Sequence, residues 1–178
     1  MGTIRFEGRQ ERGQQPLAGR PYMPGYGIKG PDEGSGLLPW SWARQQLADS
    51  HDYWLATVRP DGRPHVMPVW GVWAEEAFWF SSAPRSRKVL NLTANPRCVV
   101  TTDSPRDPVV LEGVAERVAD SEAVAAFADW INAKYAERIA VEFFTANATV
   151  RVRPLWAFAL RGGDFTGSPT RWVFPRSP

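Results

Sequence analysis

Cysteine and histidine are scarce in this 178-residue sequence, and each shortage excludes a class of protein. A single cysteine, Cys98, cannot form an internal disulfide, which argues against a small secreted domain held together by such bonds. Two histidines, His51 and His65, are too few to build a zinc site with that one thiol. We therefore expect a cytoplasmic protein without a bound metal ion.

Long apolar runs and a strong net charge are also missing. No apolar stretch approaches the ~18 residues that a membrane-spanning helix needs. The opening stretch, MGTIRFEGRQERGQQ, has charge and glutamine where a signal peptide has an apolar core. A net charge of +2 is too small to indicate binding to nucleic acid. We expect neither a membrane nor a nucleic acid as partner.

Glycine and proline are concentrated at one end of the chain. Residues 1–36 hold thirteen of them, a density that opposes both helix and interior strand. The segment RPYMPGYGI within it, with Tyr22, Met23 and Tyr26, indicates an extended arm pinned at that point, and plain disorder is the alternative. We expect this arm to precede one cofactor-binding domain at residues 37–178.

Short apolar segments separated by turn residues fill the rest of the chain. Pro60-Asp61-Gly62, for example, is typical of a tight hairpin turn. Such spacing is not a βαβ series, so we predict a mainly β protein, a six- to seven-stranded antiparallel barrel of Greek-key-like topology with peripheral helices. Strands are expected at residues 53–58, 64–73, 77–82, 98–102, 108–118, 150–160 and 170–174. Helices are expected from residue 39, at 86–94 and from residue 120 or 121.

The turn SSAPRSRK, from Ser81 to Lys88, is unusually rich in hydroxyls and cations. If Ser86 caps the helix that follows, Arg87 and Lys88 occupy its first turn, where free N–H groups and the helix dipole repel cations. A bound phosphate would offset that repulsion. A solvated basic turn is the alternative. The spacing of a nucleotide phosphate loop is absent, which argues against a nucleoside triphosphate.

Proline inside the predicted strand PHVMPVWGVW marks a second unusual place. Because Pro68 removes a hydrogen-bond donor, it belongs at a sheet edge or bulge, where backbone is open to a ligand. Alternation places Val66, Pro68 and Trp70 on one side of the strand and His65 and Met67 on the other. We expect one side of the strand in the core and the other side against the flat ring of a ligand. The alternative is that both sides are buried, one in the barrel and one in a dimer contact.

Two segments carry a resemblance to a known family. FWFSSAPRSRKVLNLTANPRCVV followed by VVLEGVAERV resembles the flavin-binding split β-barrel family typified by pyridoxamine 5'-phosphate oxidase. RPYMPGYGI, GLLPWSWARQQL and HVMPVWGVW are similar to an actinobacterial branch that includes enzymes using the deazaflavin coenzyme F420. The resemblance implies a split β-barrel and an obligate homodimer with its cofactor site between the two protomers.

The same resemblance implies roles for particular residues. Ser81–Ser82 would contact the cofactor ring or its ribityl chain, and Arg87 and Lys88 would hold the phosphate. Arg171 or Trp156 would reach the cofactor of the partner. The predicted cofactor-binding residues are His65, Val66, Met67, Pro68, Trp70, Ser81, Ser82, Ser86, Arg87, Lys88 and Arg171.

The sequence departs from the oxidase proper in ways that bear on function. The oxidase has an arginine and a lysine on the strand where this chain has His65 and Trp70, and GSPTRWVF lacks the oxidase's arginine–histidine pattern for its substrate. Oxidation of vitamin B6 is therefore not expected. Trp40, Trp42 and Trp70 are the tryptophans expected as pocket walls, and His65 either donates to ring or substrate or makes a local structural hydrogen bond.

Hydride transfer suits this chain because the cofactor carries the chemistry and no catalytic dyad is required. We predict a flavin-type oxidoreductase that transfers hydride between F420 or FMN, with F420 slightly favoured, and a small apolar or conjugated molecule. No catalytic residue is assigned. The alternative is a non-catalytic flavin, F420 or haem binding or carrier protein of the same fold.

Overall fold

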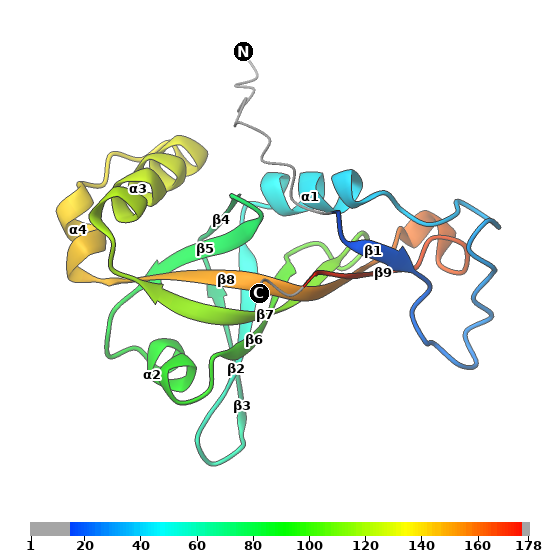
Figure 1. Ribbon diagram of the computed structural model, residues 1–178, viewed down its shortest axis with the longest axis horizontal. Helices are drawn as coiled ribbons and strands as arrows, with labels where there is room; N and C mark the ends of the chain where they lie inside the picture. The colour runs from blue at the N-terminus through cyan, green and yellow to red at the C-terminus, as the bar shows by residue number, and fades with distance from the viewer. Residues whose placement is uncertain (1–14, 176–178) are drawn as a thin grey trace.

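The computed structural model describes residues 15–175, which build one antiparallel sheet of nine strands with helices around it (Figure 1). The hydrogen-bonded order of the main path is β1-β9-β8-β7-β6-β2-β3, and β4 and β5 join it through β8. The strands are β1 (Leu17–Gly19), β2 (Tyr53–Val58), β3 (Pro64–Val69), β4 (Val72–Ala74), β5 (Ala77–Ser82), β6 (Arg97–Thr102), β7 (Val109–Val118), β8 (Ala148–Ala159) and β9 (Thr170–Val173). The helices are α1 (Trp40–Asp49), α2 (Arg87–Ala94), α3 (Ser121–Tyr135), α4 (Val141–Ala146) and the 3-10 turn η1 (Gly162–Asp164).

The sheet divides into two branches along strand β8. One edge of β8 pairs with β7 along ten residues, while its other edge pairs first with β5 and then with β9. Figure 1 shows α3 and α4 near the beginning of β8 and strands β1 and β9 near its end. A register shift at Glu112/Gly113 bends the pair, and a Cβ at Gly113 would lie 2.5 Å from the Arg153 carbonyl oxygen. The predicted mainly β, antiparallel split barrel is confirmed, but it has nine strands instead of the six or seven expected, because β1 pairs with β9 and the strand predicted at residues 64–73 divides into two.

The barrel interior is filled by alternate residues of the strands. Leu55, Val100 and Leu111 come from three neighbouring strands and are fully buried. Helix α1 covers one opening of the barrel with Ala43, Leu47 and Trp40. Trp40 packs edge-on against Trp172, with ring centroids 5.5 Å apart. The expectation that Trp40 walls a pocket is wrong, because this indole belongs to the core.

Helices α3 and α4 cover the outer side of β5. Asp120 caps α3 as predicted, and its carboxylate accepts a hydrogen bond from the Ala123 backbone N–H at 2.9 Å. Val124, Phe127 and Ile131 share one face of α3 and pack with Trp79 of β5 in one buried cluster. Tyr135 packs at the edge of the same cluster, and its hydroxyl donates to the His51 carbonyl oxygen at 2.6 Å. The short α4 is not expected from the sequence.

Helix α2 begins and ends where the sequence predicts. Ser86 occupies the N-cap position, but its side chain makes no capping bond to the helix N–H groups. Asn95, before Pro96, ends the helix in extended conformation. Val89 and Leu92 are buried against the barrel. The free N–H groups at the start of α2 therefore lack a side-chain acceptor from Ser86.

The strand predicted at residues 64–73 is wrong in one respect, since it breaks into β3 and β4 at Gly71. A Cβ at Gly71 would lie 2.2 Å from the Phe78 ring and 2.7 Å from the Trp79 carbonyl oxygen. The chain therefore presses backbone against β5 at this point. After the break, β4 pairs with β5 instead of continuing beside β2. The residues that Gly71 meets are only seven and eight positions further along, but the alternating apolar pattern of residues 64–73 gives no sign of the break.

The N-terminal arm is anchored within residues 17–36. Strand β1 pairs with β9, and the Arg20 guanidinium donates to the carbonyl oxygens of Gly30 at 2.7 Å, Pro169 at 2.7 Å and Gly167 at 2.9 Å. Tyr22 is 92% exposed, so this aromatic ring is not what pins the arm. The expectations for residues 1–14 lie outside the described residues. The division into an arm and a domain stays a prediction.

No helix among residues 15–175 has the length and apolarity needed to cross a membrane.

Candidate functional site

Hydroxyls and cations meet where β5 ends and α2 begins. The Lys88 ammonium donates to Ser82 Oγ at 3.3 Å, and Ser82 Oγ donates in turn to Ser86 Oγ at 3.1 Å. Arg87 follows in the first turn of α2 and is exposed. The fold thus gathers four of the predicted cofactor-binding residues at one helix start.

The β2–β3 hairpin adds two further basic groups to this end of the barrel. Partial burial lowers the pKa of His65, and the positive charges of Arg59, Lys88 and Arg87 lower it further. The imidazole therefore lies within the field of cations from both the hairpin and α2. In the described part of the chain, Arg59, Arg87 and Lys88 form no ion pair. The four groups Arg59, His65, Arg87 and Lys88 are called the basic cluster below.

Two buried polar atoms beside the basic cluster lack a partner. Within residues 15–175, neither Ser81 Oγ nor Arg59 Nε has a hydrogen-bond partner although both atoms are buried. An unsatisfied buried polar group costs about 1–3 kcal/mol, so such groups mark places where a ligand completes the structure. Oxygen atoms of a phosphate, a ribityl chain or a carboxylate are suitable acceptors for each of these donors. The donors present therefore fit an anionic, hydroxyl-bearing cofactor.

A buried amide connects α2 to the hairpin. Asn91 is fully buried, and its Nδ2 donates to Thr57 Oγ1 at 2.9 Å. Thr57 Oγ1 lies 3.4 Å from His65 Nδ1, near the outer limit for a hydrogen bond. The network fixes the imidazole from the helix side. This contact supports the alternative that His65 makes a local structural hydrogen bond. Because the contact uses Nδ1, the Nε2 atom of His65 is left for a ligand.

Strand β3 forms an open edge beyond this cluster. In the sheet order β3 is terminal, and it pairs with β2 alone. Val66, Met67 and Pro68 are all exposed, so neither side of this strand segment belongs to the core before Val69. The position predicted for Pro68, at a sheet edge, is confirmed. An open strand beside a basic cluster can support a flat or extended ligand along its length.

Trp70 lies at the opposite end of β3 from His65. Five residues of extended chain separate them, about 16 Å at the usual rise. The Trp70 ring stacks on Tyr135 of α3, with centroids 4.4 Å apart and planes 11° apart, and remains 45% exposed. Trp70 therefore does not join the basic cluster directly, and only an elongated ligand contacts both.

Lys134 provides a contrast to Lys88. Its ammonium donates to Tyr53 Oη at 2.6 Å and to the Gly71 carbonyl oxygen at 3.0 Å, and burial lowers its pKa to about 8. These contacts tie the end of α3 to the barrel. The protein itself supplies partners for Lys134, whereas Lys88 has only a serine hydroxyl.

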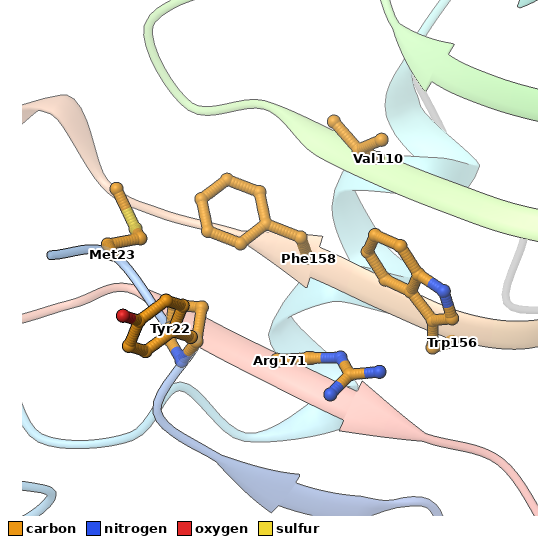
Figure 2. A pocket seen from close by; sticks show the side chains of 7 residues that line it. Tyr22, Met23, Val110, Trp156, Phe158 and Arg171 are labelled. Atoms are coloured by element: carbon orange, nitrogen blue, oxygen red, sulfur yellow. The ribbon is translucent and has the colours of Figure 1, made fainter.

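Arg171 and Trp156 lie on the far flank of the sheet. Strand β9, which carries Arg171, is five strand positions from β3 in the sheet order, about 24 Å along the sheet at the usual spacing. Figure 2 shows Arg171 beside Trp156 and Phe158, with Tyr22 and Met23 of the arm facing them. Within one chain, these residues cannot hold the same small group as the basic cluster.

Trp42, the remaining tryptophan expected as a pocket wall, is half-buried on α1. The Arg161 guanidinium lies over its ring, 5.4 Å from the ring centroid. Trp42 therefore lines neither the basic cluster nor the surface around Arg171 and Trp156.

Three residues near the basic cluster are missed by the sequence analysis. Arg59 directly precedes the hairpin turn, and an arginine there is ordinary at a surface turn. Thr57 and Asn91 reveal no function by themselves, since their pairing depends on the packing of α2 against β2. The single usable signal is the polar Asn91 within an otherwise apolar helix face.

No group of three or more metal-ligating side chains is arranged to hold a metal ion in the described ranges.

The fold and its cation-lined end define an antiparallel split β-barrel with a candidate anion site. The chain belongs to the pyridoxamine 5'-phosphate oxidase family, whose model matches residues 42–160. The match includes the hairpin, the basic turn, α2 and all of β8. No protein of curated function matches the sequence.

Solved structures of similar fold include proteins of differing description. One described as an F420 reductase is 29% identical, with a TM-score of 0.53 over 62% of this chain and 91% of that chain. The conserved hypothetical protein Rv2991 from Mycobacterium tuberculosis is 21% identical, with a TM-score of 0.61 over 79% of this chain and 91% of that one. HutZ, described as the heme storage protein from Vibrio cholerae, is 20% identical, with a TM-score of 0.53 over 65% and 87% of the two chains.

Proposed function

We propose that this protein is a cytoplasmic, homodimeric oxidoreductase of the actinobacterial branch, which binds a flavin-type cofactor, F420 in preference to FMN. The observation that carries the proposal is the basic cluster without ion-pair partners beside the orphaned Ser81 hydroxyl and Arg59 Nε. Family membership and the similarity to a protein described as an F420 reductase support the cofactor class.

Each part of the site has a role toward the cofactor. Arg87 and Lys88, with the N–H groups at the start of α2, hold the phosphate, because charge-assisted hydrogen bonds to phosphate are the strongest available there. Ser81 and Ser82 contact the ring or the ribityl region through backbone and hydroxyl groups. The open strand from Val66 to Pro68 lies along the ring, and Trp70 borders its far side.

The bound coenzyme would supply hydride transfer, while this chain's residues bind and orient it and exclude water. His65 is held by Thr57 through Nδ1, so its other nitrogen can bond to a ring oxygen or to the substrate. Burial and nearby cations lower its pKa, which keeps the imidazole neutral near pH 7. Neutral histidine at this place avoids adding a fourth full charge to the basic cluster.

F420 is favoured because of the distribution of cations. The strand residues that the oxidase proper uses for phosphate are replaced by His65 and Trp70, which weakens the case for FMN. Arg85 is exposed and within three residues of Lys88, so it can meet the acidic tail that F420 carries beyond its phosphate. We therefore expect the substrate to be a small apolar or conjugated molecule that exchanges hydride with this coenzyme.

A second copy of this chain would complete the site. The outer side of β2 and β3 exposes Trp54, Val58 and Val66 at 45%, 39% and 51%. Apolar side chains gathered on an open sheet face are typical of an interface, which needs about 800 Å² per partner to be stable. Such a dimer brings Arg171 and Trp156 of the second protomer toward the basic cluster of the first.

Equilibrium binding of FMN and of F420 to wild type and to Lys88→Ala tests the cofactor site. We expect the variant to lose affinity at least about tenfold, because a charge-assisted bond to phosphate contributes more than 1.4 kcal/mol. Lys29→Ala on the arm is the matched control and should bind normally. Equal affinity of the wild type and Lys88→Ala for whichever cofactor binds would refute the assignment.

A non-catalytic binding or carrier protein is the second candidate. One observation favours it: the basic cluster supplies cations and an imidazole for binding, but it includes no carboxylate for proton transfer. Turnover separates the two functions. Hydride exchange between reduced coenzyme and a panel of conjugated acceptors, followed by absorbance, distinguishes an enzyme from a carrier that binds without exchange.

A further inference from the structure

A second cavity lies on the outer face of the sheet, away from the basic cluster. It has a volume of about 440 Å³, within the usual range for small-molecule sites. Strands β7, β8 and β9 form its floor and the arm forms its wall, as Figure 2 shows. The lining residues are Pro21, Tyr22, Met23, Val110, Trp156, Phe158 and Arg171. They are called the arm pocket below.

The arm pocket is apolar except for one guanidinium. Trp156 and Phe158 present flat aromatic surfaces from alternate positions of β8. The Arg171 guanidinium lies 5.2 Å from the Trp156 ring centroid, a cation–π arrangement. Across the described residues, no carboxylate pairs with Arg171. Flat walls together with a cation that has no counter-ion match a planar molecule that carries an acid group.

The arm side of this pocket is held in place rather than loosely covering it. Gly19 of β1 is the register partner of Arg171 of β9, so the arm and the cation belong to one hydrogen-bonded unit. Arg20 then clamps the following loop through carbonyl oxygens of both the arm and the segment before β9. Tyr22 and Met23 come directly after this clamp, and their position is thus determined by backbone contacts.

We propose that the arm pocket binds the planar, conjugated part of the substrate, that the substrate carries an acid group for Arg171, and that Met23 limits the size it accepts. This inference rests on the proposed function, in which the arm pocket of one protomer faces the cofactor of the other. It narrows the substrate class from any small conjugated molecule to a conjugated acid.

Two naphthyl probes that differ in charge test the inference without a coenzyme. 8-Anilinonaphthalene-1-sulfonate carries a sulfonate, and N-phenyl-1-naphthylamine is the uncharged counterpart. We expect Arg171→Gln to weaken binding of the sulfonate about tenfold and to leave the uncharged probe unchanged. Met23→Ala should weaken both probes. Arg161→Gln, which removes a similar arginine from above Trp42, is the matched control and should change neither.

The outcomes separate this inference from the proposed function. Sulfonate binding that is identical in wild type and Arg171→Gln would overturn the inference, and so would loss of both probes in the Arg161→Gln control. Lys88→Ala should bind both probes normally, so failure of the cofactor site leaves this test intact. Sedimentation shows whether each variant retains the oligomeric state of the wild type, and circular dichroism shows whether each variant is folded.

Discussion

At the α2 end of the barrel, cations surround buried polar atoms, whereas at the β9 end Arg171 lies on an aromatic ring above an apolar pocket. The first place pairs Lys88 with the Ser82 hydroxyl and leaves Arg59 Nε without a partner. The second offers flat surfaces and one guanidinium. In our two proposals the same type of charge has two tasks: several cations around polar atoms would select a phosphate-bearing ligand, and a single cation among rings would select a flat acid.

Lys134 is a cation whose hydrogen-bond acceptors are supplied by the protein itself. Its ammonium has a tyrosine hydroxyl and a carbonyl oxygen as partners, and burial lowers its pKa to about 8. Arg171 and the cations of the basic cluster have no such arrangement. The difference is what our two proposals rest on: Lys134 is satisfied by the protein itself, whereas the other cations have room for a ligand as partner.

The largest expected effect comes from reversing charge at the basic cluster. Arg87→Glu with Lys88→Glu should weaken coenzyme binding on the order of 100-fold, because two attractive contacts become repulsive. Binding of the sulfonated naphthyl probe should not change. Arg117→Glu with Arg138→Glu alters net charge equally at exposed sites and is the control. If both double variants weaken coenzyme binding alike, net charge and not the basic cluster determines affinity.

Release of the arm should have an intermediate effect, and that effect should be confined to probe binding in the arm pocket. Arg20→Ala removes the bonds to the carbonyl oxygens of Gly30, Pro169 and Gly167, so Tyr22 and Met23 lose their fixed position. We expect both naphthyl probes to bind about fivefold more weakly, because preorganisation of the wall is lost. Limited proteolysis should cut residues 21–36 sooner. Arg44→Ala is the control, and reduced coenzyme affinity in Arg20→Ala would contradict the separation of the two places.

The smallest expected effect is a pH dependence of coenzyme binding. The pKa of His65 lies below its ordinary value because of burial and nearby cations, so the imidazole is neutral at pH 7 and gains a positive charge as the pH falls. Protonation favours an anionic ligand, and affinity should therefore rise about threefold between pH 7.5 and pH 5.5. His65→Gln should abolish that rise, measured by fluorescence titration. His51→Gln should retain it, and a rise that persists in His65→Gln would exclude the imidazole as its source.

Much of the fold follows from local signals in the sequence. Ser86 and Asn95-Pro96 bound α2, Asp120 begins α3, and the positive φ of Gly62 closes the hairpin as expected. Elements that depend on distant contacts were not predicted. Strand β1 exists because it pairs with β9, more than 150 positions away. The break at Gly71 depends on a nearer packing contact with Phe78 and Trp79, which the apolar pattern does not reveal.

The candidate site was predictable where its residues are adjacent in sequence. Ser81, Ser82, Ser86 and Lys88 meet through one turn, and their hydrogen bonds follow from that short spacing. Arg59 and Asn91 could not be found this way, because they reach the cluster through the hairpin and through the packing of α2. The role of the whole set toward a cofactor stays a prediction.

The sequence by itself determined the mainly β class, the basic turn at the start of α2 and the family, since hydrophobic periodicity, caps and turn residues act over a few positions. Only the tertiary structure decided that Arg59 and His65 face that turn, that Trp70 stacks on Tyr135, and that the arm walls a pocket beneath Arg171. Those arrangements depend on strand pairing and burial between residues far apart in the chain, which no local pattern encodes.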